Sequence, residues 1–194
     1  MIAPVTAQVT KKLFTVDEYY RIYQAGVISD HDRVELIAGE IVYMSPVGTK
    51  HATCVDRLNH ILMSQLIDRI QLRVQSSIQL PPNSQPQPDL ALLKRKADFY
   101  ISAHPTPADI YLLIEVADSS LAFDRNVKMP MYAAAGILEV WLVDIEAQCI
   151  EVYWLATGDR YGSSQIYRAG ESISLQAFPD VQVPVVAVFP VEQK

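Results

Sequence analysis

Two acidic side chains stand in apolar segments, where a buried charge is costly. Asp89 opens the run 88–93, and Glu115 lies inside the run 111–117. Both runs are typical of buried or half-buried strands, in which a carboxylate needs a metal, a cation or several hydrogen bonds to compensate it. Two such carboxylates on neighbouring strands can converge on one hard divalent cation such as Mg²⁺. The pair therefore predicts a metal site, with solvated strand-edge acids as the alternative.

A lysine beside such a pair would orient a water molecule or stabilise charge on a phosphate. The position two residues after Glu115, on the same face of the strand, is occupied by Ala117. Lys94 would fall on the opposite face from Asp89 if the strand ran unbroken. We therefore expect Lys128 to take this place, because it lies in the helix directly after the Glu115 strand.

Two further residues are secondary candidates. Glu35 falls on a strand whose neighbours Val34 and Leu36 face the other way, so it is either a further metal ligand or the partner of Arg33 or another cation. His51 stands near the start of a helix. It would contact a phosphate or a metal-bound water there, or serve as a partly exposed cap residue.

Composition sets the class of protein. The chain has 194 residues, of which 50% are apolar and 20% charged, as in ordinary folded proteins. The net charge of -6 argues against a strongly basic nucleic-acid binder but not against a metal-assisted nuclease. Cys54 and Cys149 lie far apart and are expected as buried free thiols. We expect no membrane span and a cytoplasmic location, because the sequence has no apolar run of ~20 residues and no signal-peptide pattern.

The elements around these residues predict an α/β (mixed α+β) fold, with a central mixed sheet flanked by helices. Thr15 and Glu18 form a capping-box pattern that starts a helix ending near Ala25. Pro130 is expected either to kink the helix around it or to mark its true start. The predicted elements are a hairpin over 33–44, a helix over 51–70, strands over 72–80, 89–93 and 110–116, a helix over 124–135, and a second hairpin formed by 139–144 and 150–154.

The ordered series of motifs resembles the Uma-two family of putative restriction endonucleases, formerly a domain of unknown function, within the PD-(D/E)xK nuclease superfamily. The resemblance covers roughly residues 14–190. It rests on the segments 35–46, 87–91, 114–116 and 139–144, together with His51, Lys128, Tyr132 and Gly136.

This resemblance implies a restriction-endonuclease-like core with an N-terminal helix-hairpin extension. It also implies hydrolysis of phosphodiester bonds in DNA, with Mg²⁺ or Mn²⁺ as the cofactor. Asp89, Glu115 and Lys128 would form the catalytic set. Asp89 and Glu115 would bind the metal, with the carbonyl of Val116 as a third ligand. The nuclease hypothesis further predicts that these residues converge in a cleft of positive potential.

We expect the chain to form a single domain over residues 1–194. Its predicted parts are a loose N-terminal arm (1–12), a helix plus hairpin (13–48), a nuclease-like core (49–145) and C-terminal strands (146–194). Trp141 and Trp154 lie on the second hairpin, which is predicted to be exposed and to pair across a two-fold axis in a homodimer.

Two other functions stay open. A non-catalytic nucleic-acid-binding or regulatory protein would retain the nuclease fold, and the acidic net charge favours it. A hydrolase of another substrate would use the two carboxylates as acid and base, with a separation of roughly 5–9 Å in a glycosidase. We rank the hydrolase of another substrate last, because the sequence has no aromatic-rich segment that would line a sugar-binding groove.

Overall fold

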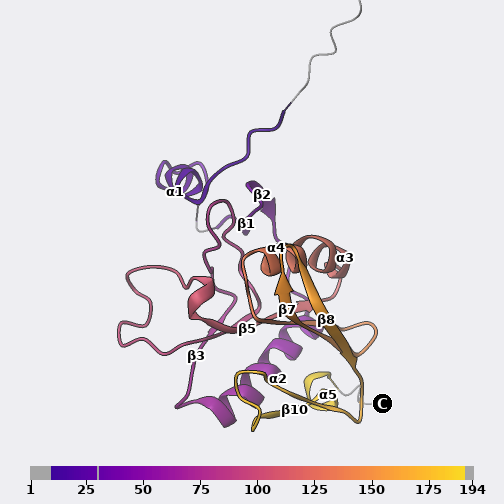
Figure 1. Ribbon diagram of the computed structural model, residues 1–194. Helices are drawn as coiled ribbons and strands as arrows, with labels where there is room; N and C mark the ends of the chain where they lie inside the picture. Colours follow the sequence, from indigo (N-terminus) through magenta and orange to yellow (C-terminus); the bar gives the residue numbers. More distant parts are fainter. Residues whose placement is uncertain (1–9, 30, 191–194) are drawn as a thin grey trace, which may run out of the picture.

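A six-stranded mixed sheet with the strand order β3-β4-β5-β6-β7-β8 forms the centre of the protein (Figure 1). The computed structural model describes residues 10–29 and 31–190. The strands are β3 (Gln71–Val74), β4 (Leu90–Leu93), β5 (Ile110–Ala117), β6 (Glu139–Asp144), β7 (Cys149–Thr157) and β8 (Arg160–Tyr167). Within this sheet β5 and β6 run parallel, and the other neighbouring pairs are antiparallel. The predicted mixed α/β class with a central mixed sheet is confirmed.

The remaining elements are the long helix α2 and several shorter helices and strands. The helical segments are α1 (Val16–Gln24), α2 (Thr49–Leu66), the 3-10 turn η1 (Pro107–Asp109), α3 (Leu121–Phe123), the π-helical segment η2 (Asp124–Lys128), α4 (Met129–Ala134) and α5 (Val185–Val188). Two separate two-stranded sheets are formed by β1 (Val34–Ile37) with β2 (Glu40–Tyr43), and by β9 (Ser172–Ser174) with β10 (Gln182–Pro184).

Side chains alternate along each strand, so the sheet carries a separate core on each face. On one face α2 buries Leu58 against β5 residues such as Leu112. On the other face α4 buries Tyr132 against Leu113. Burial of one such leucine contributes ~1.5–3 kcal/mol to stability. Glu115 shares the parity of Leu113, so the alternation directs its carboxylate toward the face that α4 covers.

The N-terminal helix and hairpin form as their local signals predict. Thr15 caps α1, and the reciprocal bonds of the capping box with Glu18 are both present. The β1–β2 hairpin turns at Gly39, which has φ +85°. An added Cβ there would lie 2.7 Å from Cβ of Leu13, so both the backbone conformation and the close approach require glycine.

Three predicted elements differ in the structure. The strand predicted over 72–80 ends at Val74, because Gln75 adopts φ +46° and leaves the extended conformation. The helix predicted over 51–70 runs from Thr49 to Leu66. The single helix predicted over 124–135 is divided into η2 and α4, with α3 before them. Pro130 directly follows the π-helical turn, and the backbone before it is already helical at Lys128 and Met129, so Pro130 does not mark a helix start.

The second predicted hairpin is present, but it is not exposed. Its strands β6 and β7 lie inside the sheet, because β8 pairs with β7 and covers it. Trp141 on β6 is fully buried. The expected exposed hairpin at a two-fold axis is therefore wrong, and β3 and β8 are the sheet edges. Cys54 and Cys149 are buried and free, as predicted.

Parts of the predicted termini lie outside the described residues. These are positions 1–9 of the predicted arm 1–12 and positions 191–194 of the predicted C-terminal strands 146–194. Within the described part of the chain, no helix is both long and apolar enough to cross a membrane.

Candidate active site

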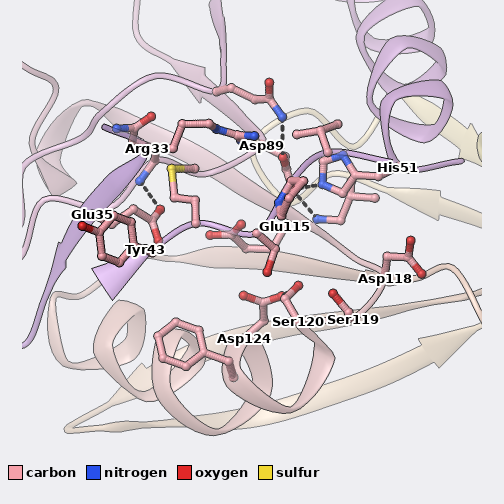
Figure 2. A pocket seen from close by; sticks show the side chains of 18 of the residues that line it. Arg33, Glu35, Tyr43, His51, Asp89, Glu115, Asp118, Ser119, Ser120 and Asp124 are labelled. Carbon is pink, nitrogen blue, oxygen red and sulfur yellow. Dashed lines mark hydrogen bonds and ion pairs between the residues drawn. The ribbon is translucent and has the colours of Figure 1, made fainter. Parts of the chain in front are cut away.

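A pocket of about 310 Å³ brings the predicted site residues together (Figure 2). It lies where β1, the start of α2, the segment before β4, the end of β5 and the segment η2 meet. Glu35, His51, Asp89, Glu115 and Lys128 all line it. The lining thus includes every residue whose side chain was predicted to act, and Val116 as well.

Asp89 is fixed at the end of the β4–β5 pairing. The register of the two strands ends with Leu90 opposite Ile114, so the N–H of Val116 lies beyond the last paired residues. Oδ2 of Asp89 accepts a hydrogen bond from this N–H at 2.8 Å, and Oδ1 accepts one from Nε2 of Gln75 at 3.1 Å. The N–H and C=O of one strand residue point to the same side of the strand. The carbonyl of Val116 therefore lies on the side of β5 where Asp89 stands.

Lys128 is held between two buried carboxylates. Its Nζ lies 3.2 Å from Oε1 of Glu115 and 3.2 Å from Oε1 of Glu35, and all three side chains are at most 7% exposed. The hydroxyl of Tyr132 donates to the same Oε1 of Glu115 at 2.5 Å. The predicted proximity of Lys128 to Glu115 is confirmed. The cation that pairs with Glu35 is Lys128, the second of the two alternatives foreseen for that residue.

Burial and neighbouring charges change the acidity of this group. Burial raises the pKa of Glu115 well above its usual value, and the carboxylates of Asp124, Asp89 and Glu35 raise it further against the opposing effect of Lys128. Burial alone would lower the pKa of Lys128, but Glu115, Glu35 and Asp124 outweigh it and raise that pKa. Lys128 therefore stays protonated and acts as a hydrogen-bond donor.

His51 supports Asp89 from α2. Its Nε2 lies 3.1 Å from Oδ2 of Asp89, and because an ionised carboxylate accepts only, Nε2 carries the hydrogen. Nδ1 is buried and has no hydrogen-bond partner among the described residues. Burial lowers the pKa of His51, but the hydrogen bond and charge of Asp89 outweigh it and raise the pKa above its usual value. His51 is thus a partner of Asp89 in the first turn of α2, with its side chain 14% exposed, and the N-cap of that helix is Gly48 rather than His51.

The pocket is acidic, which contradicts the predicted positive cleft. Its lining carries the carboxylates of Glu35, Asp89, Glu115, Asp118 and Asp124, against the cations of Arg33 and Lys128. Figure 2 shows these five labelled acids around one space. Like charges held close together are unfavourable unless a cation or bound protons compensate them. The acidic lining is therefore compensated by a cation or by bound protons, and the raised pKa of Glu115 favours proton binding there.

The donor set fits a magnesium-type cation. No group of three or more His, Cys, Asp or Glu side chains in the described ranges has the arrangement to hold a metal ion. Mg²⁺ nevertheless needs only one or two carboxylates, because it retains several water ligands. Asp89 and Glu115 would supply these two, and the carbonyl of Val116 would be a further oxygen on the same side. The residues present therefore fit the cofactor implied by the resemblance.

The segment η2 is anchored at both sides. Ser120 donates to Oδ2 of Asp124 at 2.6 Å. Arg125 bonds both carboxylate oxygens of Glu151 on β7, and the hydroxyl of Tyr153 donates to Glu151 as well. These contacts hold the turn that carries Asp124 and Lys128 against the sheet.

Several site residues were not identified from the sequence as candidates. Gln75, Ser120 and Asp124 line the pocket, and the main-chain N–H of Gln87 donates to Oε1 of Glu35 at 2.7 Å. Asp124 stands four residues before Lys128, a spacing that places both on one face of a helix and could have indicated it. Main-chain donors such as Gln87 leave no signal in residue type.

Comparison with known proteins decides the family. The family model Uma2, described as "putative restriction endonuclease", matches residues 16–187. This chain belongs to the Uma2 family. The predicted resemblance is thereby confirmed over nearly the whole described chain, and the site described above is the site of an Uma2 protein.

A solved structure shows that this Uma2 chain shares its fold with a protein described as a nuclease. The crystal structure of a putative nuclease belonging to DUF820 from Anabaena variabilis superposes with a TM-score of 0.71 at 15% sequence identity. The match covers 91% of the Uma2 chain and 97% of the other. At this level of identity the match shows the fold. No curated protein matches the Uma2 chain.

Proposed function

We propose that this Uma2 protein is a Mg²⁺- or Mn²⁺-dependent DNA endonuclease that hydrolyses phosphodiester bonds. The observation that carries this proposal is the position of the Lys128 amine. It lies 3.2 Å from Glu115 and is supplied by a helix rather than by the strand position of Ala117. Asp89 is fixed beside them by the N–H of Val116. A carboxylate pair can hold a metal ion that activates a water, and an adjacent protonated amine can donate to the charged phosphate oxygens.

Asp89, Glu115 and the carbonyl of Val116 would hold the cation. When bound, it supplies charge stabilisation to the phosphate and lowers the pKa of a bound water. Lys128 is protonated, so it serves as a donor to a phosphate oxygen or to the attacking water and not as a general base. Glu35 and Tyr132 position this arrangement, because one bonds Lys128 and the other bonds Glu115.

A cleavage assay tests the proposal. Supercoiled plasmid and single-stranded DNA are incubated with the protein and Mg²⁺ or Mn²⁺, and in parallel with EDTA. Metal-dependent nicking is expected for the wild type, with a loss of at least ~100-fold in Asp89→Ala and Lys128→Met. Asp159→Ala and Lys11→Met are matched controls, because their side chains are 77% and 80% exposed. Equal cleavage by Asp89→Ala and wild type would sink the proposal.

The second candidate is a nucleic-acid-binding or regulatory protein without activity. The acidic pocket favours this non-catalytic function, because the Lys128 amine already forms ion pairs with Glu35 and Glu115 in this structure. It predicts DNA binding without cleavage under every metal condition. The Asp89→Ala variant would then bind DNA as the wild type does.

We also propose that the protein is cytoplasmic. We further propose that it forms a homodimer, because two active sites are the simplest way to cut both strands of a duplex. With the second hairpin inside the sheet, pairing would use an edge strand such as β8, where Ile166 is 50% exposed. Sizing of the protein by light scattering at micromolar concentration tests this. A monomer across that range would refute the dimer and leave the cleavage proposal standing.

A further inference from the structure

Glu115 uses its two carboxylate oxygens differently. Oε1 accepts the hydroxyl of Tyr132 at 2.5 Å and the amine of Lys128 at 3.2 Å. No donor among the described residues bonds Oε2. Because an ionised carboxylate offers about two lone-pair sites on each oxygen, these two donors fill Oε1 and leave Oε2 open.

Oε2 of Glu115 is also accessible from the pocket. Glu115 lines the pocket, although its side chain is only 4% exposed. In the described part of the chain, the side-chain atoms that are both sealed from solvent and unpartnered are Nδ1 of His51 and Oε1 of Gln85. Oε2 of Glu115 is not one of these atoms, so it has access to the pocket although it has no partner. A cation can therefore reach Oε2.

The Lys128 amine is held by bonds that do not involve Oε2. Its Nζ donates to Oε1 of Glu115 and to Oε1 of Glu35, both at 3.2 Å. Glu35 is fixed in turn, because its Oε1 also accepts the main-chain N–H of Gln87 at 2.7 Å. An ammonium has three N–H donors, so one is left to donate to a phosphate oxygen. A cation at Oε2 would break none of these bonds.

We propose that Tyr132 is a positioning residue of the metal site, because its hydroxyl and Lys128 occupy Oε1 of Glu115 and leave Oε2 as the oxygen of that residue that binds the cation. Glu115 then binds the cation through one oxygen while the Lys128 amine stays beside it. The inference rests on the proposed nuclease function, because it assigns ligand atoms of the same site. Binding through one oxygen suits the strict octahedral geometry of Mg²⁺, whereas Ca²⁺ also takes carboxylates through both oxygens.

A structure with Mn²⁺ tests the assignment of the two oxygens. The full chain is crystallised with Mn²⁺, and anomalous scattering locates the ion. The ion is expected at ~2.1 Å from Oε2 of Glu115. Nζ of Lys128 and the hydroxyl of Tyr132 should still lie within hydrogen-bond distance of Oε1. An ion shared by both oxygens of Glu115, or a Lys128 amine displaced from Oε1, would overturn the inference.

Removal of one hydroxyl tests the role of Tyr132. Tyr132→Phe keeps the buried ring and frees a lone-pair site on Oε1 of Glu115. Loss of a group that orients a metal ligand costs roughly 10–100-fold in affinity, so Mn²⁺ binding, measured by calorimetry without DNA, is expected to weaken about ten-fold. Tyr100→Phe is the matched control, because Tyr100 is 5% exposed, donates to the carbonyl of Lys94 at 2.6 Å and does not line the pocket. Unchanged Mn²⁺ affinity in Tyr132→Phe would overturn the inference.

Ion selectivity separates positioning from a merely structural role. With a free site on Oε1, Glu115 can bind an ion through both oxygens, which favours Ca²⁺. Tyr132→Phe is therefore expected to lose less affinity for Ca²⁺ than for Mn²⁺, so that the ratio of the two Kd values changes several-fold. Tyr100→Phe should keep the wild-type ratio. An equal loss for the two ions would show a structural role and overturn the inference.

The outcomes also separate this inference from the nuclease proposal. Mn²⁺ at Oε2 of Glu115 without DNA cleavage would contradict only the nuclease proposal. Metal-dependent cleavage with the Lys128 amine displaced from Oε1 would contradict only this inference. If Tyr132→Phe does not fold, the Mn²⁺ structure of the wild type still decides between binding through one oxygen and binding through two.

Discussion

The Nζ of Lys128 and the Oε1 of Glu115 are 3.2 Å apart, although they belong to a π-helical turn and to a strand. The strand position that would most simply supply a lysine holds Ala117, which is 1% exposed. The amine reaches the carboxylate because η2 folds back over the end of β5. The positive charge beside Glu115 therefore comes from a tertiary contact between η2 and β5 and not from a residue of the strand itself.

Replacing Lys128 by methionine should lower stability markedly. The change leaves Glu35 and Glu115 buried without their cation, and removal of one partner from a buried ion pair costs ~3–5 kcal/mol. Urea unfolding at neutral pH measures this loss. Lys11→Met is the control, because Lys11 forms an exposed pair with Glu40 and its loss should cost no more than ~1 kcal/mol. A similar small loss for both variants would show that Lys128 is not the compensating cation.

Glu115 should make stability fall as the pH rises. Its pKa is raised in the folded state, so between the usual value and the folded one the folded protein binds more protons than the unfolded chain. The contribution of Glu115 is therefore most favourable at low pH and is lost as the pH rises through this window. Unfolding midpoints of wild type and Glu115→Gln, compared from about pH 5 to about pH 8, should diverge in this sense. Parallel curves would contradict it.

His51 should titrate above its usual pKa of 6.5 and His104 below it. The hydrogen bond to Asp89 outweighs burial at His51, whereas burial acts with the charge of Arg73 at His104. The stability from protonated His51 is then fully present below pH 6.5 and is lost as the pH rises through the folded pKa. NMR titration of the imidazoles measures both values. In Asp89→Asn the pKa of His51 should drop below 6.5, while that of His104 stays unchanged.

Mg²⁺ should stabilise the protein, and EDTA should reverse the effect. A cation that binds only the folded state at one hundred times its Kd adds ~2.7 kcal/mol to the free energy of unfolding. The gain should grow with pH, because protons compete for Glu115. Thermal unfolding with and without Mg²⁺ measures it, and Asp89→Asn should abolish the shift. The exposed-site variant Asp159→Asn should respond as the wild type does.

Glu151→Gln should loosen the turn that carries Lys128. The substitution removes the charged partner of Arg125 and weakens the bond from Tyr153. Hydrogen bonds to charged groups contribute ~1.5–3 kcal/mol, and the partial exposure of Arg125 places the expected loss at the lower end. Hydrogen exchange of the η2 amides should accelerate, whereas exchange in α2 should not. Glu146→Gln, at an exposed turn position, is the control.

The sequence predicted the elements whose signals are local. The capping box at Thr15 and Glu18 fixed the start of α1, because its two hydrogen bonds need only neighbouring residues. The alternation over 72–80 predicted a longer strand than the structure forms, since Gln75 turns away at φ +46° and its N–H bonds the carbonyl of Asp89 instead. Periodicity carries no information about a turn that is stabilised by a distant segment.

The sequence predicted those site residues that stand out by their type or by their order along the chain. Asp89 and Glu115 stood out because charge in apolar strands is costly, and Lys128 followed from the helix after β5. Asp124 and the main-chain donor of Gln87 did not stand out. Their roles depend on distances across the pocket that no spacing along the chain records.

The π-helical turn also determines where the chain can vary in length. The N–H of Met129 bonds the carbonyl of Asp124, five residues earlier, so this turn holds one residue more than an ordinary helical turn. Deleting Asn126 should return the turn to α-helical spacing and leave Lys128 and Tyr132 on the face that meets Glu115. A deletion between Lys128 and Tyr132 has no extra residue to absorb it, so it would rotate Tyr132 by about 100° away from Glu115. Two neighbouring turns of one helix should therefore differ in whether they tolerate the loss of a residue.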